Sequence, residues 1–248
     1  MRRRTLLLAT ALFLLTLRAL AQEAPVKILA TIAVEGAFAE IEPLLPARSG
    51  VPVEVEFATT AALVERLANG ETADLAILTK EAVQQLAAKG LVRSSTDLVL
   101  SVIGIAVGDD APLPVMKTTE DFVAFMKATP SIAYTARGVS GLHVARLIEQ
   151  LGLADVVKPK AVVVDGFSGT PLRDGKVAAA VQQISELKFT GAKNIVPLPD
   201  EIQVRTVFTV VVLKGATNAD SAAKIVRVLT SPEAAAAYER SGASPLFK

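Results

Sequence analysis

Short apolar runs alternate with amphipathic stretches near the start of this 248-residue chain. Short apolar runs predict buried strands, and apolar residues at helical spacing predict helices. The expected order is strand 26–30, helix 37–45, strand 53–58, helix 61–68, strand 74–78 and helix 81–88. This alternation is typical of βαβ units around a mainly parallel sheet, where ligands bind beyond the carboxyl ends of the strands.

Two longer extended runs, 98–107 and 203–213, lie about a hundred residues apart. Between them and after them we expect a second α/β series: helix 119–128, strand 132–134, helix 140–151, strand 161–164, a short helix near 171–174, strand 177–181, and helices 219–229 and 232–241. The pattern predicts an α/β fold with two lobes, each a mainly parallel sheet flanked by helices and joined by two crossing strands. Residues 22–103 and 210–248 would form lobe one, and residues 104–209 would form lobe two.

The first 21 residues have the pattern of an export signal. Arg2, Arg3 and Arg4 precede an uncharged apolar run over 5–17, and Ala19-Leu20-Ala21 supplies a small-x-small cleavage site. The run is shorter than the ~20 residues that a membrane-spanning helix needs. We expect cleavage near Ala21 and a periplasmic mature protein, with both the general and the twin-arginine export routes left open.

Charge and composition exclude several kinds of partner. Without residues 1–21 the chain loses four arginines and no acid, so its net charge changes from +1 to −3. Nucleic-acid binding calls for a basic excess, and we expect none. The chain has no cysteine, which excludes disulfides and thiolate ligands. A lone histidine, His143, without an acidic cluster gives no reason to expect a metal, and no motif points to a cofactor.

A glycine loop at 138–141 follows the strand expected at 132–134 and precedes a helix. Ser140 stands where a helix N-cap belongs. Strand, loop and capped helix together would aim free backbone N–H groups and the positive end of a helix dipole at one point. An anion can bind there without a charged side chain, although a serine that only caps its own helix explains the same residues.

Several phrases of the chain, in order, resemble the periplasmic molybdate-binding family of ABC transporter receptors. They are GETADL at 70–75, SG at 140–141, ISEL at 184–187, PLPDEIQ at 197–203 and LTSPEA at 229–234. The resemblance implies a two-lobed, type II periplasmic binding fold that closes on a small anion and delivers it to a membrane permease. We expect a monomer.

The family holds its anion with hydroxyl and backbone N–H donors from several loops, and uncharged donors suit a buried oxyanion. Two positions depart from this pattern, since Ala33 stands near an expected serine and Gln183 at an expected tyrosine. The ligand-binding residues that the resemblance implies, with Arg137 added as a possible carboxylate clamp, are Thr31, Ala33, Thr59, Thr60, Arg137, Ser140, Gly141, Ser168 and Gln183. The longer donors, Gln183 and Arg137, would suit an organic acid, whereas Arg137 as a solvated loop charge is the simpler interpretation.

The residues and the resemblance are compatible with two functions, a binding protein and an enzyme. The first is a non-enzymatic receptor for a molybdate-like oxyanion or a small carboxylate, because no catalytic motif is present. The second is a periplasmic isomerase of a small tricarboxylate, since aconitate isomerase is similar to this family. It would need a base such as His143 or Glu35 to remove a proton next to a carboxylate.

Overall fold

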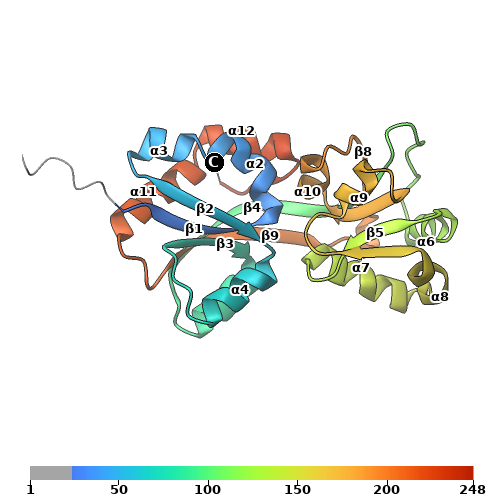
Figure 1. Cartoon of the computed structure of the whole chain (residues 1–248), viewed down its shortest axis with the longest axis horizontal. Helices are drawn as coiled ribbons and strands as arrows, with labels where there is room; N and C mark the ends of the chain where they lie inside the picture. The colour runs from blue at the N-terminus through green and yellow to red at the C-terminus, as the bar shows by residue number, and fades with distance from the viewer. Residues whose placement is uncertain (1–23, 248) are drawn as a thin grey trace, which may run out of the picture.

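The computed structural model describes residues 24–247. The expected export signal, residues 1–21, lies outside this range. Within it, no helix is both long enough and apolar enough to pass through a membrane. The chain forms two lobes side by side, each with a sheet between layers of helices (Figure 1).

The sheet of lobe one starts from three parallel strands in the order β2–β1–β3. Their bounds are β1 Val26–Thr31, β2 Val53–Ala58 and β3 Leu75–Thr79. Next to β3 runs the antiparallel β9 (Arg205–Leu213), then β4 (Val92–Val107), to which the short β10 (Ser244–Pro245) adds. The three parallel strands confirm the α/β prediction made from the alternating runs.

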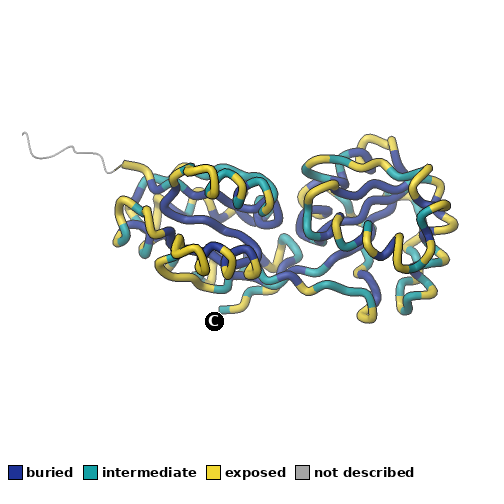
Figure 2. The backbone as a smooth tube through the Cα atoms, turned by 90° about the horizontal axis from the view of Figure 1, so that it is seen from below, coloured by how far each residue is buried: buried dark blue, intermediate teal, exposed yellow. Residues whose placement is uncertain are grey.

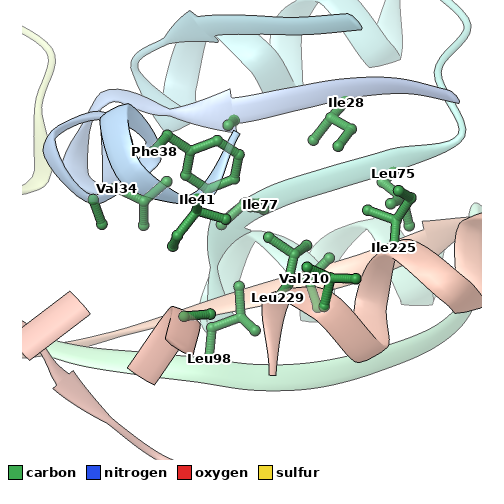
Figure 3. Packing of buried hydrophobic residues seen from close by; sticks show 14 of the residues in the cluster. Ile28, Val34, Phe38, Ile41, Leu75, Ile77, Leu98, Val210, Ile225 and Leu229 are labelled. Carbon is green, nitrogen blue, oxygen red and sulfur yellow. The ribbon is translucent and has the colours of Figure 1, made fainter. Parts of the chain in front are cut away.

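Helices cover both faces of this sheet (Figure 1). On one face lie α2 (Glu35–Ile41), α3 (Leu44–Ser49), α11 (Ala219–Leu229) and α12 (Pro232–Ser241), and on the other α4 (Thr60–Ala68) and α5 (Lys80–Ala88). A 3-10 turn, η2 (Ile32–Val34), joins β1 to α2. Figure 3 shows Phe38 and Ile41 of α2 packed over the strands, toward Leu229 of α11. Each fully buried side chain of this kind contributes roughly 1.5–3 kcal/mol.

Lobe two has the strand order β4–β7–β5–β6. Its strands are β5 Ile132–Thr135, β6 Ala161–Val164, β7 Ala179–Gln183 and β8 Asn194–Pro197, with β5 parallel to both β6 and β7. One face carries α6 (Thr119–Ala128), α7 (Val139–Gln150) and α8 (Ala154–Val157), and the other carries α9 (Gly169–Arg173) and α10 (Ile184–Phe189). Two 3-10 turns, η3 (Lys158–Lys160) and η4 (Asp200–Ile202), complete the lobe. In both lobes the buried backbone follows the strands (Figure 2).

Strand β4 connects the two lobes. Its residues up to Val102 pair with β9, whereas those from Ile103 to Val107 pair with β7 and β8. The expected division after residue 103 lies one residue beyond this change of partner and stays a prediction. The expected division after residue 209 falls inside β9, which pairs with β4 from Arg205 to Leu213 and with β3 from Phe208 to Val212.

Candidate functional site

A cavity of about 360 Å³ lies between the lobes, at the carboxyl ends of β1, β2 and β3. It is the place at which parallel α/β sheets bind ligands. Residues from both lobes line it: Thr31, Ile32, Ala33, Thr59, Thr60, Ala61, Val64, Thr79, Glu81, Ala82, Gln85 and Phe208 from lobe one, and Arg137, Gly138, Val139, Ser140, Leu142, Gln183 and Glu186 from lobe two.

Two threonines start helices at the wall formed by lobe one. Thr59 caps α4 by accepting a hydrogen bond from Ala62 N at 3.3 Å, and Thr79 caps α5 by accepting one from Ala82 N, also at 3.3 Å. Each cap satisfies only one of the backbone N–H groups that the first turn of a helix leaves free. The first turns also contribute Thr60 and Ala61 of α4 and Glu81 of α5 to the lining of the cavity.

Helix α7 supplies the opposing wall from lobe two. Its N-cap is Gly138, which has no side chain to cap the first turn, and Ser140 is the second helical residue. The expectation that Ser140 caps this helix is therefore wrong. Because Gly138 leaves the N–H groups of Val139, Ser140 and Gly141 without an acceptor in the helix, α7 offers more free donors than a serine-capped helix would.

Gly141 does not line the cavity, and it sets how closely α7 approaches β5. A Cβ atom added there would overlap the carbonyl oxygen of Thr135 at the end of β5. Only a glycine allows this approach, which holds the first turn of α7 against the strand end.

Gln183 is buried at the base of the cavity, with 2% of its surface exposed. Its Nε2 donates to Thr206 Oγ1 at 3.1 Å, and its Oε1 is buried without a hydrogen-bond partner in the described chain. A half-turn of the amide would let the Thr206 hydroxyl donate to Oε1 and free the NH2 group for a ligand. Thr60 also lines the cavity with a buried hydroxyl that lacks a partner among residues 24–247.

Ser168 lies away from the cavity. Its Oγ lies 3.0 Å from Val181 O and 2.9 Å from Gln182 Oε1, two acceptors for its single hydroxyl proton, and its N–H donates to the same Oε1 at 2.7 Å. Gln182 in turn donates to Gly166 O at 2.9 Å. This network braces the inside of lobe two, so the structure separates Ser168 from the other expected ligand residues.

Arg137 is the cationic member of the cavity lining, and it sits at the rim. Its guanidinium pairs with Glu65 of α4 at 2.8 Å, and both side chains are more than half exposed. The pair bridges the two lobes across the mouth of the cavity. The guanidinium of Arg137, which was expected to bind a ligand carboxylate, is paired with the carboxylate of Glu65 instead.

Glu186 lines the cavity too, and sequence reasoning did not include it in the site. It is 6% exposed, and its Oε2 accepts a hydrogen bond from Gln183 N at 3.2 Å. Burial raises the pKa of Glu186 to about 8, against the lowering effect of the Gln183 N–H and the Gln182 side chain, and the charge of Glu35 adds to the rise. Burial also raises the pKa of Glu35.

His143 lies outside the cavity lining. Its Nε2 is 2.7 Å from Ile202 O, to which it donates. Residues 24–247 contain no group of three or more His, Cys, Asp or Glu side chains placed to hold a metal ion. The donors gathered around the cavity are hydroxyls, amides and backbone N–H groups, which suit an anion.

The family model for bacterial extracellular solute-binding proteins matches residues 26–243. The chain belongs to this family. Among curated proteins, the solute-binding protein is similar to an aconitate isomerase from a Pseudomonas species, with 28% identity over 230 residues that cover 88% of this chain and 87% of the relative.

Solved structures share its fold. The periplasmic molybdate-binding protein of Azotobacter vinelandii has a TM-score of 0.72 at 14% identity, over 88% of this chain and 98% of that one. PEB3 of Campylobacter jejuni with bound L-phospholactate has a TM-score of 0.65 at 16% identity, over 88% of this chain and 99% of that one. These matches confirm the type II periplasmic binding fold for the solute-binding protein.

Proposed function

We propose that this solute-binding protein holds a small anion in the cavity between its lobes, in the periplasm, and presents it to the permease of an ABC transporter. The observation that carries the proposal is the convergence of three helix N-termini, those of α4, α5 and α7, on one cavity. Each N-terminus carries about half a positive charge. Together the three N-termini roughly offset one to two negative charges of a ligand.

The size of the cavity favours a carboxylate over a tetrahedral oxyanion. The cavity, about 360 Å³, has room for more than the four oxygens around one atom of such an oxyanion. Apolar side chains line part of it, including Ile32, Val64 and Phe208. Such a wall suits a carbon skeleton between charged ends, as in a small di- or tricarboxylate.

The names of two similar proteins agree with this class of ligand. L-phospholactate, the ligand of the PEB3 structure, carries a carboxylate and a phosphate on a short carbon chain. The name of the Pseudomonas relative specifies a tricarboxylate substrate. We therefore place small organic carboxylates ahead of molybdate for this protein.

A thermal-shift screen tests the proposal. The panel holds molybdate, tungstate, sulfate, citrate, and cis- and trans-aconitate, each with a sodium chloride control of equal ionic strength. A ligand at 1,000 times its Kd stabilises by about 4 kcal/mol, which raises Tm by several degrees. We expect shifts with carboxylates. Shifts with molybdate and tungstate alone would refute the carboxylate assignment, and no shift with any anion would refute the proposed function.

The same protein samples test the alternative, an isomerase. Conversion of cis- to trans-aconitate is followed in the ultraviolet, with boiled protein as control. We expect binding without turnover. Turnover that disappears in Glu186→Gln but survives in His143→Ala would favour the enzyme, with a buried carboxyl as its base.

A further inference from the structure

Glu186 occupies a position that an anion-binding cavity should not tolerate. Its side chain is almost fully buried in the wall of the cavity, and no Lys or Arg of the described chain lies within ion-pair distance of it. An ionised carboxylate there would repel the anion that the helix N-termini attract. A buried Glu186 is therefore compatible with a bound anion only if its carboxyl group is neutral.

The charged groups around α10 do not provide a neutralising partner. The titratable residues of the elements packed against it and of α10 itself are Glu35 and Glu40 of α2, Lys188 of α10, Glu233, Tyr238, Glu239 and Arg240 of α12, and Arg93 and Asp97 of β4. Glu40 pairs with Arg240, Glu233 with Arg48, and Asp97 with Lys80. Lys188 donates to Arg240 O.

After burial, which has the largest effect, the charged group that acts on Glu186 is another acid. Glu35 begins α2 of lobe one, and its charge disfavours the ionised form of Glu186 in lobe two. Within the cavity lining, Glu81 is exposed and Arg137 is engaged with Glu65. Burial and the charge of Glu35 thus outweigh the hydrogen bonds from the Gln183 N–H and the Gln182 side chain and favour a proton on Glu186, and a bound anion would favour it further.

We propose that Glu186 is a specificity-determining residue, which accepts an anion in the cavity only when protonated and then donates a hydrogen bond to a ligand oxygen. Its Oε2 already accepts from Gln183 N, so Oε1 carries the proton toward the ligand. Binding then takes up one proton whenever Glu186 is ionised in the free protein. This inference rests on the proposed function, because it concerns the ligand of the same cavity.

Isothermal titration calorimetry with trans-aconitate and with molybdate tests the inference. For the probe that binds, we expect the affinity of the wild type to fall about 30-fold between about pH 6.5 and about pH 9.5, since one group of pKa about 8 must regain its proton. Titrations in two buffers of different ionisation enthalpy should show about one proton taken up per ligand at the higher pH and almost none at the lower.

Two variants separate Glu186 from other acids. Glu186→Gln keeps an oxygen for Gln183 N and an NH2 for the ligand, so its affinity should change less than about 2-fold over this range. Glu81→Gln alters an exposed acid of the same cavity and should retain the full fall of the wild type.

The outcomes distinguish this inference from the proposed function. Wild-type binding that is equally tight at both pH values, without proton uptake, would overturn the inference and leave the proposed function standing. The same pH dependence in Glu186→Gln as in the wild type would also overturn it. Failure of both probes to bind at any pH would overturn the proposed function, and the inference with it.

Discussion

Gln182 and Gln183 are adjacent and chemically identical, yet their side chains have different roles. Gln182 holds Ser168 and Gly166 inside lobe two, whereas Gln183 lines the cavity with an oxygen that has no partner in the described chain. We expect Gln183→Leu to weaken anion binding by about 10- to 100-fold, because a ligand would lose a buried partner worth about 1–3 kcal/mol. Calorimetric titration measures the loss.

Gln182→Leu is the matched control. It leaves the buried Ser168 N–H without its acceptor, whereas the hydroxyl keeps Val181 O, so the free energy of unfolding should fall by about 1–3 kcal/mol. Chemical denaturation of both variants reports this. If Gln183→Leu loses stability rather than affinity, Gln183 is a structural residue and its assignment to the site is wrong.

Glu186 makes stability depend on pH. Its pKa is about 8 in the folded protein and about 4.5 ordinarily, so between these values the folded state holds a proton that the unfolded chain releases. The stabilising contribution is complete below about pH 4.5 and is lost as pH rises to about 8, at about 1.4 kcal/mol per unit. Relative to Glu186→Gln, the wild type should lose stability from about pH 5 to about pH 8. Parallel pH profiles of the two proteins in urea denaturation would contradict this.

At the scale of elements, α7 depends on how closely it approaches β5. Gly141→Ala would drive a methyl group into the Thr135 carbonyl, so the first turn must move away from the strand. We expect a loss of about 1–3 kcal/mol in stability, together with weaker anion binding. Gly108→Ala is the control, because a Cβ there meets open space and should change stability by less than ~0.5 kcal/mol. Equal effects of the two substitutions would show that the close approach has no role.

The elements themselves could largely be predicted from local pattern. The alternation of apolar runs and helical periods predicted β1 to β3, and the helix expected at 232–241 is α12, where Ser231 accepts from Ala234 N and Pro232 is the first helical residue. The short β8 and α10 were not predicted, since a four-residue strand and a six-residue helix carry too little periodicity. The N-cap of α7 was misjudged by two residues, because Ser140 near a helix start resembles a cap although Gly138 occupies that position.

The site residues that could be predicted from the sequence are those that follow the carboxyl ends of predicted strands. Thr31, Thr59 and Thr60 come directly after or within apolar runs, and they line the cavity. Thr79 follows the third run in the same way and could have been included. Ser168 and Glu186 could not be placed, because their surroundings depend on contacts between distant segments: Ser168 with β7, and Glu186 with α2 of the opposite lobe.

For the whole molecule, two of the polar contacts that join the lobes near the cavity differ in their exposure to solvent. Ser185 Oγ of α10 donates to Ala33 O at 2.8 Å in a buried contact, and Arg137 pairs with Glu65 at the exposed mouth. Ser185 is the residue before Glu186 on the short helix α10. The second pair closes the rim, where salt and water weaken it.

A double-mutant cycle distinguishes two roles of Arg137, a bridge between the lobes and a clamp on a ligand carboxylate. If the guanidinium only bridges the lobes, Arg137→Gln and Glu65→Gln should each weaken ligand binding by less than about 1 kcal/mol, and the double variant should lose no more than either. Titration calorimetry at low salt measures all four proteins. A loss of more than about 2 kcal/mol in Arg137→Gln alone would instead identify Arg137 as a clamp on a ligand carboxylate.

The most direct measurement is a crystal structure of the protein with the carboxylate that gives the largest thermal shift. We expect the anion between the lobes, with its oxygens about 2.7–3.1 Å from backbone N–H groups in the first turns of α4 and α7, and one oxygen facing Glu186. Density for the anion outside this cavity, or paired there with a Lys or Arg side chain in place of these donors, would contradict the central claim that uncharged donors hold it.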